Sequence, residues 1–94
     1  MGRFISLHAK ARMQQRAVPR EVLDCLLDHG RVHHDHHGAE VVYFDKAGRE
    51  RARRSGATEA IREMRKYFNT YAVVGKGGKV VTVGRRTRRY RRDT

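Results

Sequence analysis

The sequence is poor in cysteine, in acidic residues and in long apolar runs. Its 94 residues include one cysteine, Cys25, which cannot form an intramolecular disulfide, so a reducing cytoplasm is the expected location. No run approaches the roughly 18 apolar residues that a membrane-spanning helix needs. The first residues also lack the apolar core of a secretory signal. We therefore expect a cytoplasmic protein without a membrane partner.

The shortage of acidic residues leaves a large positive charge. The chain has 22 Lys and Arg against 10 Asp and Glu, which gives a formal net charge of +12. Most of the cations are arginine, whose guanidinium matches phosphate oxygens two at a time. Such a field attracts polyanions and strengthens phosphate binding through counterion release. The composition favours RNA as the partner, although a solvated basic surface without a dedicated ligand is the alternative.

The N-terminal third of the chain predicts two helices. The first covers residues 5–17, with an apolar residue at every fourth position and Ser6 as its N-cap. The second begins at Pro19, carries a wide apolar face, and ends at Gly30. The apolar residues that define the two faces are Ile5, Ala9, Met13, Val22, Leu23, Leu26 and Leu27.

The later segments predict two pairs of strands. They are rich in β-branched and aromatic residues and are interrupted by glycines. Gly38 lies between the first two strands, and Lys76-Gly77-Gly78 is a strong turn signal between the last two. The four predicted strands comprise residues 31–37, 40–45, 71–75 and 79–85.

The connection between the two strand pairs is long and basic. Residues 46–57 predict a loop, and Thr58 is the predicted N-cap of a third helix. Ile61, Met64 and Phe68 would share one face of this helix. We therefore expect a single α+β domain over residues 1–85. It would have two N-terminal helices, an antiparallel sheet of about four strands, and an extra helix before the last hairpin.

The C-terminal segment, residues 86–94, is too rich in arginine to fold alone and predicts a disordered tail. Its cations would bind phosphates, and its tyrosine could stack on a base. The tail residues expected to bind nucleic acid are Arg86, Arg88, Arg89, Tyr90, Arg91 and Arg92.

The most informative motif lies on the first predicted helix. His8, Arg12 and Arg16 are spaced at i, i+4 and i+8, which places them on one polar ridge. Two arginines could hold a phosphate while the imidazole moves a proton, because the ordinary pKa of histidine lies near neutrality. By spacing alone, a solvated helix face that carries an incidental histidine is the favoured interpretation.

A family resemblance extends this motif. The segments FISLHAKARMQQRAVPREVLDCLLDHG, VVYF and VVTVGRR resemble domain of unknown function family 4258. The match covers residues 4–45 and 71–85, whereas residues 46–70 are longer than the usual connection. Members resemble the RelE/ParE-type toxin fold and the wider barnase–colicin-like nuclease group. The resemblance implies a RelE-like fold and metal-independent RNA cleavage without a cofactor, or RNA binding by a relative that has lost cleavage.

The resemblance also implies roles for five residues. His8 would act as general base on a ribose 2′-hydroxyl or as acid for the leaving oxygen. Arg12, Arg16 and Arg85 would stabilise charge on the phosphate, and Thr82 would donate a hydrogen bond to it. Thr82 is also an ordinary β-branched strand residue, and Arg85 could simply begin the basic tail.

Two further groups of residues are candidates for binding. Imidazoles spaced as in His33-His34-Asp35-His36-His37 can bind zinc, nickel or copper, but no cysteine pair or HExxH helix completes a site. An exposed, histidine-rich hairpin end is the simpler interpretation, and we predict no metal. Aromatic residues on a sheet can stack unpaired bases, although most are more simply core residues. The aromatic candidates are Tyr43, Phe44, Tyr67, Phe68, Tyr71 and Tyr90.

The leading functional hypothesis is a toxin-like, metal-independent endoribonuclease. The alternative is a non-catalytic RNA-binding or ribosome-associated basic module of the same fold, and a metal-binding protein is a third. A DNA-binding protein is disfavoured because no recognition helix stands out. The expected partners are RNA, an acidic antitoxin, which toxins of this kind often have, and the ribosome.

Overall fold

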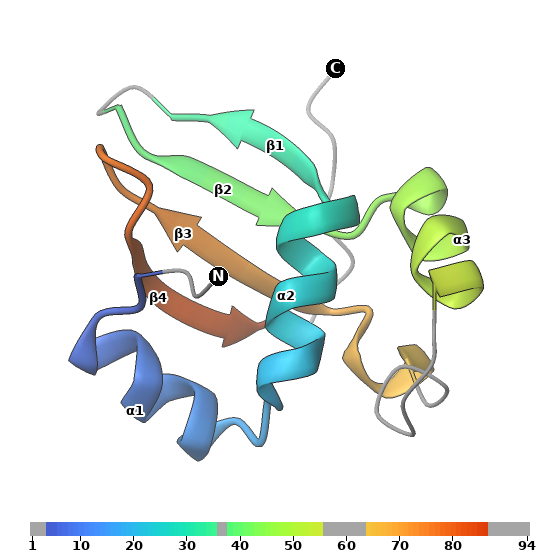
Figure 1. Cartoon of the computed structure of the whole chain (residues 1–94), viewed down its shortest axis with the longest axis horizontal. Coiled ribbons are helices and arrows are strands. Elements are labelled where there is room, and N and C mark those ends of the chain that lie inside the picture. Colours follow the sequence, from blue (N-terminus) through green and yellow to red (C-terminus); the bar gives the residue numbers. More distant parts are fainter. Residues whose placement is uncertain (1–3, 36–37, 56–63, 87–94) are drawn as a thin grey trace.

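A computed structural model of the chain describes residues 4–35, 38–55 and 64–86. These residues form helices and an antiparallel sheet, which confirms the predicted α+β class (Figure 1). The elements in chain order are α1 (Leu7–Gln15), α2 (Arg20–His29), β1 (Arg31–His34), β2 (Glu40–Tyr43), α3 (Lys46–Ser55), the short 3-10 helix η1 (Met64–Tyr67), β3 (Thr70–Val74) and β4 (Val80–Arg85).

The two N-terminal helices begin within two residues of the predicted starts, and Ser6 is the N-cap of α1 as predicted. The Ser6 hydroxyl accepts the Ala9 N–H at 3.0 Å, and Pro19 precedes α2 as its N-cap. The first helix is shorter than expected because the backbone before Ser6 is extended, so Ile5 forms a β-bridge with Val80 instead of a helical turn. At the other end of α1, Ala17 adopts a φ of 53°, which a helix cannot continue through.

The four strands form one antiparallel sheet in the order β1-β2-β3-β4. Val42 lies opposite Ala72, which in turn lies opposite Val83. The last hairpin turns where the sequence predicts, since Gly77 and Gly78 both have positive φ angles that favour glycine. The register shifts once, at Val73 and Val74 of β3.

The core lies between the sheet and the two N-terminal helices. In Figure 1, α2 crosses one face of the sheet, and α1 runs beside β4, with which it packs. Leu23 and Leu26 of α2 have no exposed surface, and Ala9 of α1 is buried in the same cluster. The sheet contributes Val42, Ala72, Val80 and Val83.

Residues 46–55 do not form the predicted loop, because Lys46–Ser55 is the helix α3; the last two residues of that loop, 56 and 57, lie outside the described residues. Asp45 caps this helix: its Oδ1 accepts the Gly48 N–H at 2.7 Å, and its backbone oxygen accepts the Arg49 N–H. The described chain thus has a helix before the last hairpin, as expected, but it starts earlier. Thr58 and Ile61 lie outside the described residues, and residues 64–67 form the 3-10 helix η1.

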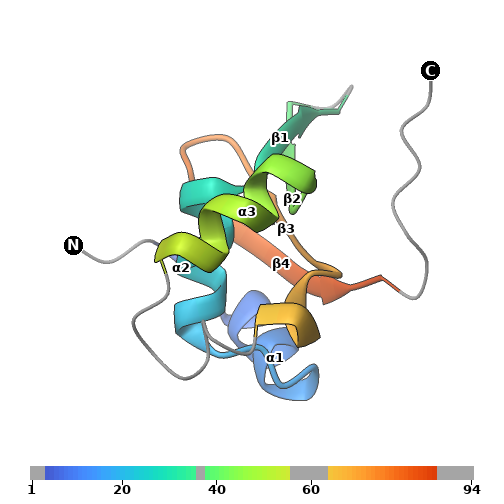
Figure 2. The ribbon, with the colours of Figure 1, turned by 90° about the vertical axis from the view of Figure 1, so that its right-hand side faces the viewer.

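The second view shows how the layers are arranged (Figure 2). The helices gather on one side of the sheet, and none of those in the described ranges lies on the opposite side. We call that opposite side the open face. No helix in the described ranges has both the length and the apolar character that crossing a membrane demands.

Candidate nucleic-acid interface

The open face is built by strand alternation. Because Val42, Ala72 and Val83 point into the core, their chain neighbours point the other way. The strand register places these neighbours in one row across the sheet, at the end of the sheet from which α3 and η1 continue. The row comprises Arg31, Tyr43, Tyr71 and Gly84.

Arginine and tyrosine stack at the centre of this row. The Arg86 guanidinium carbon lies 5.0 Å from the Tyr43 ring centroid and 5.5 Å from that of Tyr71. Tyr71 lies across Gly84, since a Cβ added there would sit 2.6 Å from the Tyr71 hydroxyl oxygen. A side chain on Gly84 would therefore displace the tyrosine. Tyr43 is buried, so Tyr71 and Arg86, both half-buried, are the groups within reach of a ligand.

Asn69 holds the end of β4 in place. Its backbone oxygen accepts the Arg86 N–H at 2.8 Å, and its side-chain Nδ2 donates to the Arg86 carbonyl at 2.9 Å. Its Oδ1 accepts the Arg85 Nε–H at 3.1 Å. Sequence reasoning missed this residue. An asparagine before a predicted strand is typical of a turn, but this pattern does not predict which residues the asparagine side chain contacts.

The side chains of Arg85 and Arg86 lie on opposite faces of the sheet. Arg85 points away from the open face, where Nη2 donates to the Lys66 carbonyl and the guanidinium lies 5.6 Å from the Tyr67 ring centroid. Arg86 continues the open face. Thr82 is half-buried and lies opposite Val73 on the open face. The structure therefore separates Thr82 and Arg85, which the family resemblance placed in one site.

The polar ridge of α1 lies on the helical side of the molecule. His8 and Arg16 are exposed, and the half-buried Arg12 donates from Nη1 to the Gln15 side chain at 3.2 Å. Arg16 is the C-cap of α1 rather than part of its regular turns.

The structure does not bring the ridge together with Arg85. His8 lies near the start of β4, because the Ser6 N–H donates to the Val80 oxygen at 2.9 Å. Arg85 ends that strand, about 16 Å further along at the usual rise per residue. The catalytic roles of His8, Arg12, Arg16, Thr82 and Arg85 stay predictions.

Several predicted residues lie outside the described part of the chain: Arg88, Arg89, Tyr90, Arg91 and Arg92 of the tail, and two histidines of the cluster, His36 and His37. Within the described ranges, no three His, Cys, Asp or Glu side chains converge on a metal-sized site. His34 Nδ1 instead lies 3.5 Å from Glu40 Oε2 on the neighbouring strand.

Cys25 is placed as a structural residue. Burial raises the pKa of its thiol, and the charge of Asp28 acts in the same direction. The contact with the Ser55 hydroxyl, at 4.0 Å, lowers the pKa but does not reverse the shift. A buried thiol that stays neutral at physiological pH is a poor nucleophile.

Comparison with known proteins adds no relative: no family model, curated protein or solved structure matches the chain. The resemblance to domain of unknown function family 4258 therefore stays a prediction carried by the motif residues.

Proposed function

We propose that this protein binds single-stranded RNA on the open face of its sheet. The observation that carries the proposal is the stack of Arg86 on Tyr43 and Tyr71, on a face that no described helix covers. Unpaired bases stack on tyrosine rings and on guanidinium planes, and sheets with aromatic residues at their centre are a common way to bind them. The net charge of +12 supplies the attraction for phosphates.

The geometry favours single strands over duplexes. A base can reach Tyr71 and Arg86 only if it is not stacked between its own neighbours in a helix. Arg31 lies in the same row, on β1, whereas Gly84 lies on β4. Arg31 would therefore meet the phosphate backbone of an RNA that crosses the sheet. An RNA partner and a lone neutral thiol are both compatible with the cytoplasmic location that the sequence predicts. The acidic antitoxin and the ribosome stay predictions of the family resemblance.

The proposal is tested by fluorescence anisotropy with a labelled, unstructured RNA oligonucleotide. Tyr71→Ala should weaken binding by about 1–3 kcal/mol, the usual contribution of one stacked base. Arg86→Gln should weaken binding and lower the slope of log affinity against log salt by about 0.7, the value for one phosphate contact with a single strand. Lys10→Gln, an exposed cation on α1, is the control for net charge. Equal losses in Lys10→Gln and Arg86→Gln would contradict the proposal.

Metal-independent RNA cleavage is the second candidate, and the exposure of His8 favours it. This imidazole lies in the first turn of α1, and Arg12 follows one turn later. In such a reaction a ribose 2′-hydroxyl attacks the adjacent phosphorus and the bond to the 5′-oxygen breaks. His8 would take the hydroxyl proton while water protonates the leaving 5′-oxygen, or it would supply that proton while water accepts the one from the hydroxyl. The test is RNA cleavage in EDTA by the native protein and by His8→Ala. Cleavage that His8→Ala leaves intact, or no cleavage by the native protein, would remove this role.

A further inference from the structure

Helix α3 carries a concentrated positive charge. Lys46–Ser55 holds five cations, Lys46, Arg49, Arg51, Arg53 and Arg54, against the single carboxylate of Glu50, so its formal charge is +4 over 10 residues. Glu50 is already paired with Arg53 at 2.9 Å. Among the described residues, no carboxylate pairs with Lys46, Arg51 or Arg54.

Part of this charge works against the stability of the helix. Arg49 and Arg53 are like charges at i, i+4, an arrangement that destabilises a helix by some tenths of a kcal/mol. Lys46 lies in the first turn, where the helix dipole disfavours a cation. The residues that α3 buries are Gly48 and Ala52, so it adds almost no apolar side chain to the core. A helix with so many cations and so little buried apolar surface is suited to bind an anionic partner.

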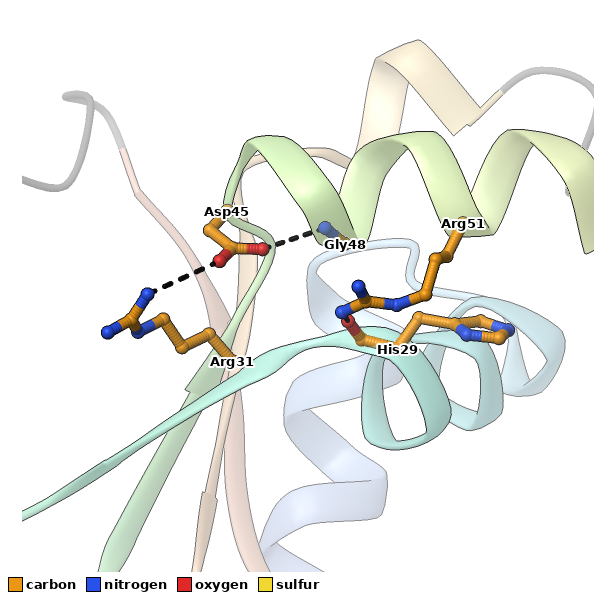
Figure 3. A network of polar contacts seen from close by, with 5 residues as sticks. All are labelled: His29, Arg31, Asp45, Gly48 and Arg51. Carbon is orange, nitrogen blue, oxygen red and sulfur yellow. Dashed lines mark hydrogen bonds and ion pairs between the residues drawn. The ribbon is translucent and has the colours of Figure 1, made fainter.

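Three contacts hold α3 in place: the cap at its first turn, the Arg51 side chain and the close approach of Gly48 to α2 (Figure 3). Asp45 caps the first turn through Gly48, and its Oδ2 lies 3.7 Å from Arg31 Nη1. Arg51 reaches across to α2 and donates to the His29 carbonyl at 2.8 Å. Gly48 allows the close approach of the two helices, because a Cβ there would sit 2.7 Å from the His29 oxygen.

Two of the arginines are fixed on one aromatic ring. The guanidinium carbons of Arg49 and Arg53 lie 5.4 and 5.5 Å from the centroid of Phe68, which packs edge-on against Phe44. Stacking covers the flat face of a guanidinium and leaves N–H groups at its rim. Arg53 is exposed, whereas Arg49 is half-buried with its Nε enclosed. These side chains are therefore partly ordered before any anion arrives, which lowers the entropic cost of binding.

Helix α3 lies on the helical side of the sheet, but its first turn lies near Arg31, at the β1 edge of the open face. The row across the sheet runs from Gly84 through Tyr71 and Tyr43 to Arg31. Arg31 contacts Asp45, and Asp45 is followed at once by Lys46. A single-stranded RNA that crosses the open face along this row therefore leaves the sheet beside the first turn of α3.

We propose that α3 is a second phosphate-binding surface, which receives the backbone of a single-stranded RNA as it leaves the open face. Lys46 and Arg54 are its best candidate contacts: both are exposed, neither side chain pairs with a carboxylate of the described residues, and they lie about two turns apart on the helix. This inference rests on the proposed RNA binding by the open face. It adds that a long RNA is bound more tightly than a short one, because α3 contacts its phosphates. These contacts depend on charge and not on the base sequence.

The experiment compares two unstructured, labelled RNA oligonucleotides across a salt series. One has about 4 nucleotides, enough for the open face, and the other about 12, long enough to continue onto α3. The α3 variant combines Lys46→Gln and Arg54→Gln. Its control combines Lys76→Gln and Lys79→Gln, two exposed cations in the hairpin turn at the opposite end of the sheet. Both variants lose two charges, so a general effect of net charge is the same in each. Circular dichroism verifies that both are folded.

The α3 variant should bind the short oligonucleotide with the same affinity as the control variant. For the long one, its slope of log affinity against log salt should fall by about 1.4 relative to the control, or 0.7 for each of two phosphates. The inference is overturned if the two variants bind the long oligonucleotide equally, or if the α3 variant loses as much with the short one.

Tyr71→Ala separates this inference from the proposed function. If Tyr71→Ala weakens both oligonucleotides while the α3 variant matches its control, RNA binding by the open face stands and the role of α3 falls. If Tyr71→Ala weakens neither, the proposed function fails. In that case a loss in the α3 variant would show an isolated basic helix, and the continuous path from the open face would be overturned.

Discussion

Two helices of 10 residues, α2 and α3, pack against each other but contribute to the molecule in different ways. α2 buries Val22, Leu23, Cys25 and Leu26, whereas α3 buries only Gly48 and Ala52. Burial of a leucine side chain contributes about 1.5–3 kcal/mol, and a glycine or alanine contributes far less. Helix α2 therefore stabilises the fold, whereas α3 adds little to the core and presents charge.

The largest effect on the free energy of unfolding should come from a substitution in α2. Leu23→Ala removes a side chain with no exposed surface, so we expect a loss of about 2–5 kcal/mol in the free energy of unfolding. Arg54→Ala on α3 should change it by less than about 0.5 kcal/mol. Urea unfolding followed by circular dichroism measures both. Similar losses for the two variants would break the distinction between the helices.

The contact between the helices should come second. Gly48→Val places atoms against the His29 carbonyl and Asp45, so we expect a loss of about 1–3 kcal/mol. Ala47→Val, at the exposed neighbouring position, controls for the lower helix propensity of valine. The same denaturation measurement applies. An equal effect of the two substitutions would mean that α3 does not depend on close approach to α2.

The helix cap gives a smaller effect. Asp45→Ala removes the acceptor for the Gly48 N–H, which should lower stability by about 1 kcal/mol. Asp45→Asn keeps a capping oxygen but removes the charge that lies 3.7 Å from Arg31, so its loss should be a fraction of that. Thermal unfolding of the two variants separates these contributions. A larger loss in Asp45→Asn than in Asp45→Ala would contradict the role as N-cap.

The smallest effect concerns Cys25, which lies on α2 and contacts Ser55 at the end of α3. Because burial raises the pKa of the thiol, labelling by iodoacetamide should be slow at neutral pH and accelerate only above the ordinary pKa of a free cysteine. Because the pKa is higher in the folded protein, the neutral thiol contributes to the free energy of unfolding. This contribution is fully present below the pKa of the unfolded thiol and is lost as pH rises through the pKa of the folded one. Gly48→Val should speed labelling if it displaces α3. Fast labelling of the native protein near pH 7 would contradict the burial of this contact.

Much of the fold can be predicted because its signals are local. Ser6, Pro19 and Gly30 mark helix ends by their own chemistry, and Gly77-Gly78 marks a turn. The helix α3 could not be predicted in the same way. It has no apolar stripe, and its packing depends on Gly48 meeting the end of α2, a contact between distant segments.

The candidate interface shows the same limit. Tyr43, Tyr71, Thr82 and Arg86 can each be named from the sequence, but no spacing reveals that strand register brings them to one face. The register also separates Thr82 from Arg85, which are three residues apart on one strand. A regular spacing within one helix is a weak guide to a site that several strands assemble.

The most direct test of the open face is an amide NMR titration of the protein with a short, unstructured RNA. We expect the largest shift changes at the Arg31 end of β1 and around Tyr71, Gly84 and Arg86, with α1 little affected. The changes should saturate together and shrink as salt is added. Shifts concentrated on Leu7–Gln15, with the sheet unchanged, would contradict the account and place RNA on the polar ridge of α1 instead.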